Sequence, residues 1–371
     1  MKQRVSRNIV LFTSIMILAA ACVATPASPA TGESIVPVVE PTIPLVPTLP
    51  FTPEAPTVEP IFTLPSAEGY VLGYEADENQ NIDGLLKACA ETKMECVRGK
   101  DIDELVKKEV DVIISYSSEW HVFGVWPQIQ NAKAASIPIF MLNADSGEQP
   151  DIYNISTLYS SLRASLEWMM AEMGGEGEFV YFNFGPNNYI QEIIDEVLAA
   201  NPKVEATSMP ASFDGESFTK ESIAEMVKAN PKIKAIWSSN KQMDIFWALA
   251  DLEDVEHLPV FLCTAGVNDL NGWKKWLESD PNFKCFATIN PGHTDYEGVY
   301  AALFYLNGEP FNSKALGGKW GNTLSYDYPI ITSDNLDEWM GKVDSLEEGD
   351  YGVYRLPAMT PEEIHTRWFK K

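Results

Sequence analysis

The chain has 371 residues, of which 45% are hydrophobic and 11% aromatic, the composition of a globular protein with a sizeable core. Its formal net charge of −26 leaves no basic surface for phosphates, which excludes nucleic-acid partners. The four histidines are scattered, and the chain has no CxxC, P-loop, G-x-G-x-x-G or G-x-S-x-G motif. We therefore expect no metal, no cofactor and no enzyme activity.

Residues 1–21 have the layout of a secretory signal peptide. Three basic residues precede the apolar run Ile9–Ala21, which is too short to span a bilayer as a stable helix. Cys22 follows three alanines directly, and this arrangement resembles the bacterial lipobox, in which the cysteine is lipidated and becomes the mature N-terminus. We expect Cys22 to anchor the protein to the cell membrane on its extracytoplasmic side. The alternative is a soluble secreted protein, because Ala19 stands where a lipobox usually has Leu.

Residues 22–66 are rich in proline and contain no Lys, Arg or Trp. Such a segment cannot bury a core and favours polyproline II, so we interpret it as a semi-rigid stalk.

Short apolar runs then alternate with amphipathic segments. Strands are predicted at 70–75, 95–99, 110–117 and 138–144, with helices at 81–93, 101–109 and 125–137. In the second half, strands are predicted at 179–185, 204–211, 234–240, 259–266 and 284–291, and helices at 158–173, 188–202, 221–231, 243–252, 271–279 and 294–308. Alternation of this kind indicates parallel sheets with helices on both faces.

The predicted fold class is α/β, with two doubly wound parallel-sheet domains joined by a hinge and a ligand cleft between them. The N-terminal lobe is expected to comprise 67–152 and about 292–340. The C-terminal lobe is expected at 153–291, followed by a C-terminal tail at 341–371.

Four cysteines remain beyond Cys22. An even number in an exported chain permits two disulfides, Cys89–Cys96 within one short segment and Cys263–Cys285 between consecutive predicted strands. Four buried thiols are the alternative, and the sequence does not decide between them.

Several segments resemble the type I periplasmic binding proteins, the ribose- and galactose-type sugar-binding lipoproteins of ABC importers. They are KKEVDVIISYS, QNAKAASIPIFMLNAD, SMPASFDGES, NPKIKAIWSSNKQM and YPIITSDNLDEW, the last resembling the tail that returns to the first domain. The resemblance implies a protein that binds a small ligand in the cleft and delivers it to an ABC permease.

The residues that the resemblance places at the ligand depart from the family pattern. Asn143 and Ala265 stand where the family has acids, Ala144 replaces an arginine, and Gln191 lies near the place of another arginine. Asn240 is retained and Phe213 provides the facing aromatic. Asn240 fits capping of the following helix equally well.

Together with polar and aromatic residues at other predicted strand ends, these positions form the expected ligand site: Glu75, Asp77, Ser117, Trp120, Asn143, Asp145, Gln191, Phe213, Asn240 and Asn290. Trp237 lies inside a predicted strand, so we expect it in the core. Amides suit a neutral ligand because they both donate and accept hydrogen bonds.

The sequence thus predicts a monomeric, lipid-anchored solute-binding protein for a small neutral polar ligand, a sugar in the first place. A nucleoside-binding lipoprotein, and a sensor that presents its bound state to a membrane kinase, are the alternatives.

Overall fold

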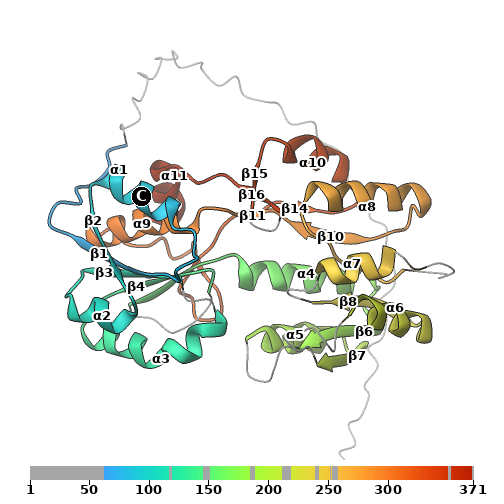
Figure 1. Ribbon diagram of the computed structural model, residues 1–371. Coiled ribbons are helices and arrows are strands. Elements are labelled where there is room, and N and C mark those ends of the chain that lie inside the picture. The colour runs from blue at the N-terminus through green and yellow to red at the C-terminus, as the bar shows by residue number, and fades with distance from the viewer. Residues whose placement is uncertain are drawn as a thin grey trace, which may run out of the picture. The chain divides into compact units, whose positions relative to one another are not determined.

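The computed structural model describes residues 62–116, 119–144, 151–183, 189–210, 219–238, 242–250, 252, 258–349 and 352–369. Cys22 and the proline-rich segment up to residue 61 lie outside these ranges. None of the helices within them is both long and apolar enough to cross a bilayer. The described chain forms two lobes, each with β-strands covered by helices (Figure 1).

The N-terminal lobe is built on a seven-stranded sheet in the order β12-β13-β5-β4-β3-β1-β2. Its strands are β1 (Val71–Glu75), β2 (Glu95–Gly99), β3 (Val112–Ser115), β4 (Ile139–Leu142), β5 (Ile152–Ile155), β12 (Leu316–Gly317) and β13 (Thr323–Leu324). Neighbours run parallel except β12 and β13. Helices α1 (Asp83–Thr92), α9 (Thr294–Leu306) and α11 (Pro361–Trp368) cover one face, and α2 (Ile102–Lys107) and α3 (Glu119–Ala134) the other (Figure 1).

Strand β3 shows why the sheet is covered on both faces. Val112 and Ile114 pack into the core beneath α1 and α9, whereas Ile113 packs into the core beneath α2 and α3. Because successive side chains of a strand point to opposite faces, a run that is apolar throughout needs helices on both sides. The predicted doubly wound α/β class is confirmed.

The C-terminal lobe contains the strand order β7-β6-β8 and the order β14-β10-β9, joined by a parallel bridge between Ala235 and Val260. Its strands are β6 (Glu176–Asn183), β7 (Lys203–Pro210), β8 (Ile233–Trp237), β9 (Phe261–Leu262), β10 (Cys285–Thr288) and β14 (Ile330–Ile331). Its helices are α4 (Leu158–Glu172), α5 (Tyr189–Ala200), α6 (Lys220–Ala229), α7 (Gln242–Ala250), α8 (Val267–Ser279) and α10 (Leu336–Val343).

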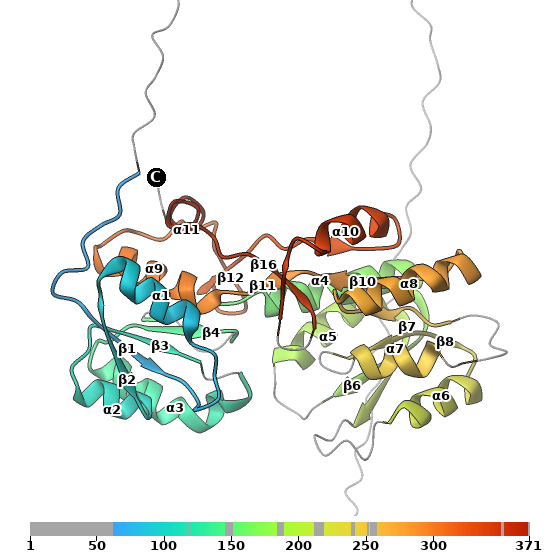
Figure 2. The same ribbon diagram turned by 45° about the horizontal axis from the view of Figure 1, so that its top comes forward.

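The chain passes between the lobes after β5, at β11 (Asn290–Pro291), between β13 and β14, and after β16 (Tyr354–Leu356). Strand β16 runs parallel to β11, next to it in Figure 2, and pairs antiparallel with β15 (Glu347–Glu348). The second and fourth passages are therefore hydrogen-bonded to each other. The sequence predicted only two crossings.

The structure corrects the expected place of the C-terminal segments. Residues up to 340 were expected in the N-terminal lobe, but β14 pairs with β10 and α10 packs on α8, both in the C-terminal lobe. The expected tail is an ordered return to the N-terminal lobe, where Ile364 and Trp368 of α11 are fully buried. No helix was predicted from the sequence in this part of the chain, and a local pattern does not say which lobe provides the apolar surface that a segment covers.

The first residues of the described chain also differ from the expected stalk. Phe62 and Leu64 pack against the core of the N-terminal lobe, and the Phe62 ring centroid lies 6.2 Å from that of Phe304. The folded part therefore begins before residue 67.

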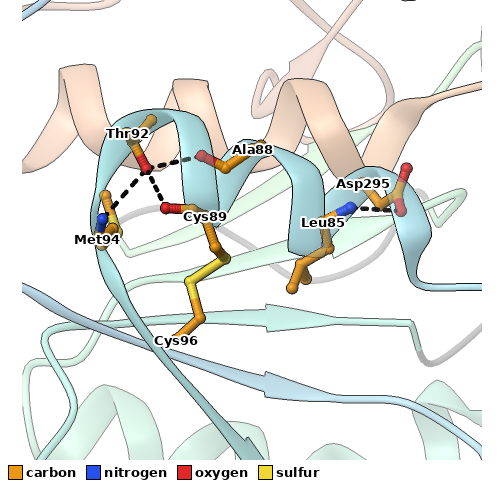
Figure 3. Close-up of a disulfide and its surroundings, with 7 residues drawn as sticks. All are labelled: Leu85, Ala88, Cys89, Thr92, Met94, Cys96 and Asp295. Atoms are coloured by element: carbon orange, nitrogen blue, oxygen red, sulfur yellow. Dashed lines mark hydrogen bonds between the residues drawn. A yellow bond between two sulfur atoms is a disulfide. The ribbon is translucent and has the colours of Figure 1, made fainter.

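Both possible disulfides are present in the structure. Cys89–Cys96 joins the end of α1 to β2, next to Thr92, whose hydroxyl donates to the carbonyl oxygen of Ala88 at 2.8 Å (Figure 3). Cys263–Cys285 joins the neighbouring strands β9 and β10, with a Cα–Cα distance of 5.9 Å.

Candidate ligand-binding site

The carboxyl ends of β1, β3 and β4 meet at one edge of the N-terminal sheet, because these strands run parallel. Glu75 ends β1 opposite Ser115, which ends β3, and the Ser115 hydroxyl donates to Glu75 Oε2 at 2.9 Å. Asn143 follows β4 with a φ of 53°, a left-handed conformation that Asn tolerates better than most residues. Its Nδ2 donates to Thr294 Oγ1 at 3.4 Å.

Asp295, in the first turn of α9, ties this edge to helix α1. Its Oδ2 accepts hydrogen bonds from the Leu85 backbone N–H at 2.9 Å and from the Tyr116 hydroxyl at 3.1 Å (Figure 3 shows the first). A Cβ on Gly84 would lie 2.4 Å from Asp295 Oδ1, so a larger residue there would displace the Asp295 carboxylate. Helix α1 has no side-chain cap of its own, and Asp295 supplies the missing acceptor at its positive end.

Tyr116 stays a hydrogen-bond donor under all ordinary conditions. Burial, reinforced by the Asp295 carboxylate, raises the pKa of its hydroxyl far above the usual range. Three hydrogen-bonded pairs of side chains thus lie at this edge, and we call them the polar edge: Glu75 and Ser115, Tyr116 and Asp295, and Asn143 and Thr294.

The C-terminal lobe contributes fewer described candidates. Gln191 on α5 donates to Tyr181 Oη at 3.2 Å and to Asp195 Oδ1 at 2.8 Å. Asn290, on the β11 passage, accepts a hydrogen bond from Thr157 Oγ1 at 3.2 Å. Trp237 is fully buried and its Nε1 donates to Ser165 Oγ at 3.0 Å, which confirms the prediction that it belongs to the core.

Of the residues expected at the ligand, Glu75 and Asn143 lie at the same edge of the N-terminal sheet. Asp77 is exposed in the loop after β1, where its carbonyl oxygen accepts a hydrogen bond from Arg98. Trp120 falls in the first turn of α3, but its side chain is outside the described part of the chain, as are Ser117, Asp145, Phe213 and Asn240.

Sequence reasoning missed Tyr116, Thr294 and Asp295. Tyr116 directly follows a buried strand, a position that is itself a signal for a site residue. Asp295 comes from a helix 179 residues further along the chain, and no local pattern indicates its contact with Tyr116. No cluster of metal-binding side chains occurs among the residues that the structure describes.

Comparisons with known proteins agree on the fold. An ABC sugar transporter subunit from Rhodobacter sphaeroides 2.4.1 is 17% identical, with a TM-score of 0.51, and the alignment covers 73% of this chain and 100% of that one. An ABC transporter solute-binding protein from Thermobispora bispora is 14% identical, with a TM-score of 0.54 and coverage of 80% and 94%. The binding protein of the arabinose transporter from Shewanella sp. ANA-3 is 15% identical, with a TM-score of 0.50 and coverage of 73% and 95%.

A comparison with curated protein sequences gave no match. The family model described as the periplasmic binding protein domain matches residues 98–310, more than half of the chain. The chain therefore belongs to the periplasmic binding protein family, and its two α/β lobes are those of the type I members.

Proposed function

We propose that this protein is the lipid-anchored solute-binding component of an ABC importer and that its ligand is a small neutral ring-containing solute, a sugar in the first place. The observation that carries the proposal is the polar edge, which gathers hydroxyl, amide and carboxylate groups at the carboxyl ends of parallel strands, where α/β sheets bind ligands. The proposal includes no chemical step on the ligand.

The charge of the polar edge supports a neutral ligand. The N-terminus of α1 would attract an anion, but the Asp295 carboxylate already accepts the Leu85 N–H there. Glu75 adds a second carboxylate at the same edge, which disfavours phosphates and dicarboxylates. The amide and hydroxyl groups of the polar edge suit a ligand that presents hydroxyls, because they both donate and accept hydrogen bonds.

The ligands named for two solved structural neighbours support a sugar as the ligand of this protein. The Shewanella protein was solved with α- and β-L-arabinofuranose, and another structural neighbour, 12% identical, is described as a galactofuranose-binding protein. In our proposal Asn240, Phe213 and Trp120 complete the grip on the ring, since an aromatic face suits the apolar side of a sugar.

Thermal-shift screening against neutral sugars, nucleosides, sugar phosphates and dicarboxylates tests the proposal. A ligand present at 100 times its Kd adds about 2.7 kcal/mol of stability, so a true ligand raises Tm clearly. Asn143→Ala should weaken binding of that ligand by about 1–3 kcal/mol in calorimetry, because it removes a hydrogen-bonding partner. Asn131→Ala on α3, whose amide donates to Asp103 of α2 at 2.9 Å, is the matched control.

Three outcomes of the screen decide between the candidates. A nucleoside as the best ligand would replace the sugar by the second candidate. Tight binding of a sugar phosphate or a dicarboxylate would overturn the neutral-ligand proposal, and no shift with any compound would contradict the binding function.

The anchor is tested separately, because it does not depend on the ligand. Cys22→Ser should move the protein from the detergent phase to the aqueous phase, since two acyl chains hold a protein on a membrane and none remain in the variant. A variant that still partitions into detergent would refute lipidation at Cys22.

A further inference from the structure

The C-terminal hairpin, which we define as the described residues 347–349 and 352–356 with β15 and β16, lies against the chain just beyond the carboxyl end of β9. The Tyr354 backbone N–H donates to the Ala265 carbonyl oxygen at 3.3 Å. The Gly352 carbonyl oxygen lies so close to Gly266 that a Cβ on Gly266 would come within 2.8 Å of it. The carboxyl end of a parallel strand is where a ligand of this fold is expected.

Backbone hydrogen bonds hold the hairpin in this place. Strand β16 pairs with β11, where Leu356 lies opposite Pro291, and the Gly292 N–H donates to the Leu356 carbonyl oxygen at 3.2 Å. Within the hairpin the Gly349 N–H donates to the Val353 carbonyl oxygen at 2.8 Å. The apolar side chains of Val353, Tyr354 and Leu356 pack against the core of the C-terminal lobe. The hairpin is thus a packed element of the fold.

The residues beneath the hairpin are buried although they come after a strand end. Ala265 is fully buried and Asp269, in the first turn of α8, is only 3% exposed. The Thr264 hydroxyl donates to Asp269 Oδ2, while Oδ1 has no hydrogen-bond partner among the described residues. Burial raises the pKa of the Asp269 carboxyl to about 6. These are the properties of a polar strand end that has been closed off from solvent.

We propose that the C-terminal hairpin closes the carboxyl end of β9 to the ligand, so that β9 supplies no ligand contact in this protein. The resemblance to sugar-binding proteins implies an acid at position 265 that holds the sugar, whereas Ala265 stands there and is fully buried next to the hairpin. The inference rests on the proposed function for the existence of a ligand. It restricts that ligand to a small neutral molecule that needs no acid at this end of the cleft.

Paired glycine substitutions test the closure without a ligand. Gly266→Ala puts a methyl group against the Gly352 carbonyl oxygen, whereas Gly341→Ala on α10 meets no atom within 4 Å. Amide hydrogen exchange at Tyr354 should be at least tenfold faster in Gly266→Ala than in the wild type and unchanged in Gly341→Ala. Equal exchange in the two variants would overturn the placement of the hairpin over β9.

Ala265→Asp tests the consequence for the ligand by restoring the family's acid. With β9 closed, this variant should melt several degrees lower and bind no sugar of the panel more tightly than the wild type does. A variant that melts like the wild type and binds a sugar tenfold more tightly or more weakly would show an open strand end and overturn the proposal. If the wild type itself binds nothing, the proposed function fails, while the exchange measurement still decides the closure.

Discussion

Glu297 offers a test of how the last three passages between the lobes are joined. Its side chain is 1% exposed and projects from α9, directly after the β11 passage. Oε1 accepts the Met359 N–H at 2.8 Å, just before α11, and Oε2 accepts the hydroxyl of Tyr326, just after β13. One buried carboxylate therefore connects three segments that are distant in the sequence.

The buried carboxylate makes stability depend on pH. Burial raises the pKa of Glu297 from 4.5 to about 7, with a smaller contribution from Asp295, while Met359, Tyr326 and Arg367 oppose the shift. A raised pKa adds stability that is fully present below the unfolded-state pKa and is lost as the pH rises through the folded-state pKa. At 1.36 kcal/mol per pKa unit, the wild type loses about 3 kcal/mol between pH 4.5 and pH 8 through this group.

Glu297→Gln removes the titration and keeps an oxygen acceptor for the Met359 N–H. We expect the difference in Tm between wild type and variant to change by roughly 6 °C from pH 4.5 to pH 8, at roughly 2 °C per kcal/mol, with the wild type relatively weaker at high pH. Asp269, whose pKa is also raised, titrates in both proteins and cancels in the difference. The exposed Glu95→Gln is the control. Parallel Tm–pH curves for wild type and Glu297→Gln would refute the reasoning.

Two further predictions concern the N-terminal lobe and the disulfides. Each disulfide, closing sequence separations of 7 and 22 residues, should contribute about 2–3.5 kcal/mol by restricting the unfolded chain, so reductant should lower Tm; a melt unaffected by reductant would contradict this. Gly84→Ala should push the Asp295 carboxylate away from the N-terminus of α1 and cost about 1 kcal/mol, the usual loss for a helix cap, and melting like the Gly341→Ala control would argue against that role.

The sequence predicted the core strands well because a run of consecutive apolar residues indicates a strand that is buried on both faces. VIIS at β3 is apolar up to its last residue and IFML at β4 is apolar throughout, and both strands are fully buried. Strand β5 was missed because Asn154 interrupts its apolar residues. That asparagine is fully buried and its Nδ2 donates to Asn322 Oδ1, 168 residues away, a partner that no local pattern reveals.

Helix α11 was missed although its beginning has a local signal. Thr360 caps the helix, Pro361 is its first residue, and Glu363 completes a capping box. What the sequence does not contain is the surface that α11 covers. Strand 259–266 was also predicted too long. In the structure β9 comprises only Phe261–Leu262, preceded by the bridge at Val260, and the C-terminal hairpin contacts the chain at Ala265, beyond the end of β9.

The sequence predicted those site residues that lie at the end of a predicted strand. It did not predict those that a helix distant in the sequence brings to the same edge. Glu75 ends β1 and Asn143 directly follows β4, and the parallel order of the strands brings both to one edge. Asp295 belongs to the same edge because α9 packs along α1, a contact between the two ends of the lobe's sequence.

Phe62 and Phe369 both contact the aromatic ring of Phe304, and this arrangement has a mechanical consequence. Both lie against Phe304 of α9, with ring centroids 6.2 Å and 5.2 Å from it, so the first and last described residues of the fold are fastened to the same helix. A pull applied through either residue is carried by the N-terminal lobe. The C-terminal lobe is joined to that lobe by the four passages and by an ion pair between Lys319, just after β12, and Glu192 of α5. A sensor built from this protein can therefore be fixed to a surface through either of these two residues and carry its reporter on the C-terminal lobe, which then lies outside the line of force.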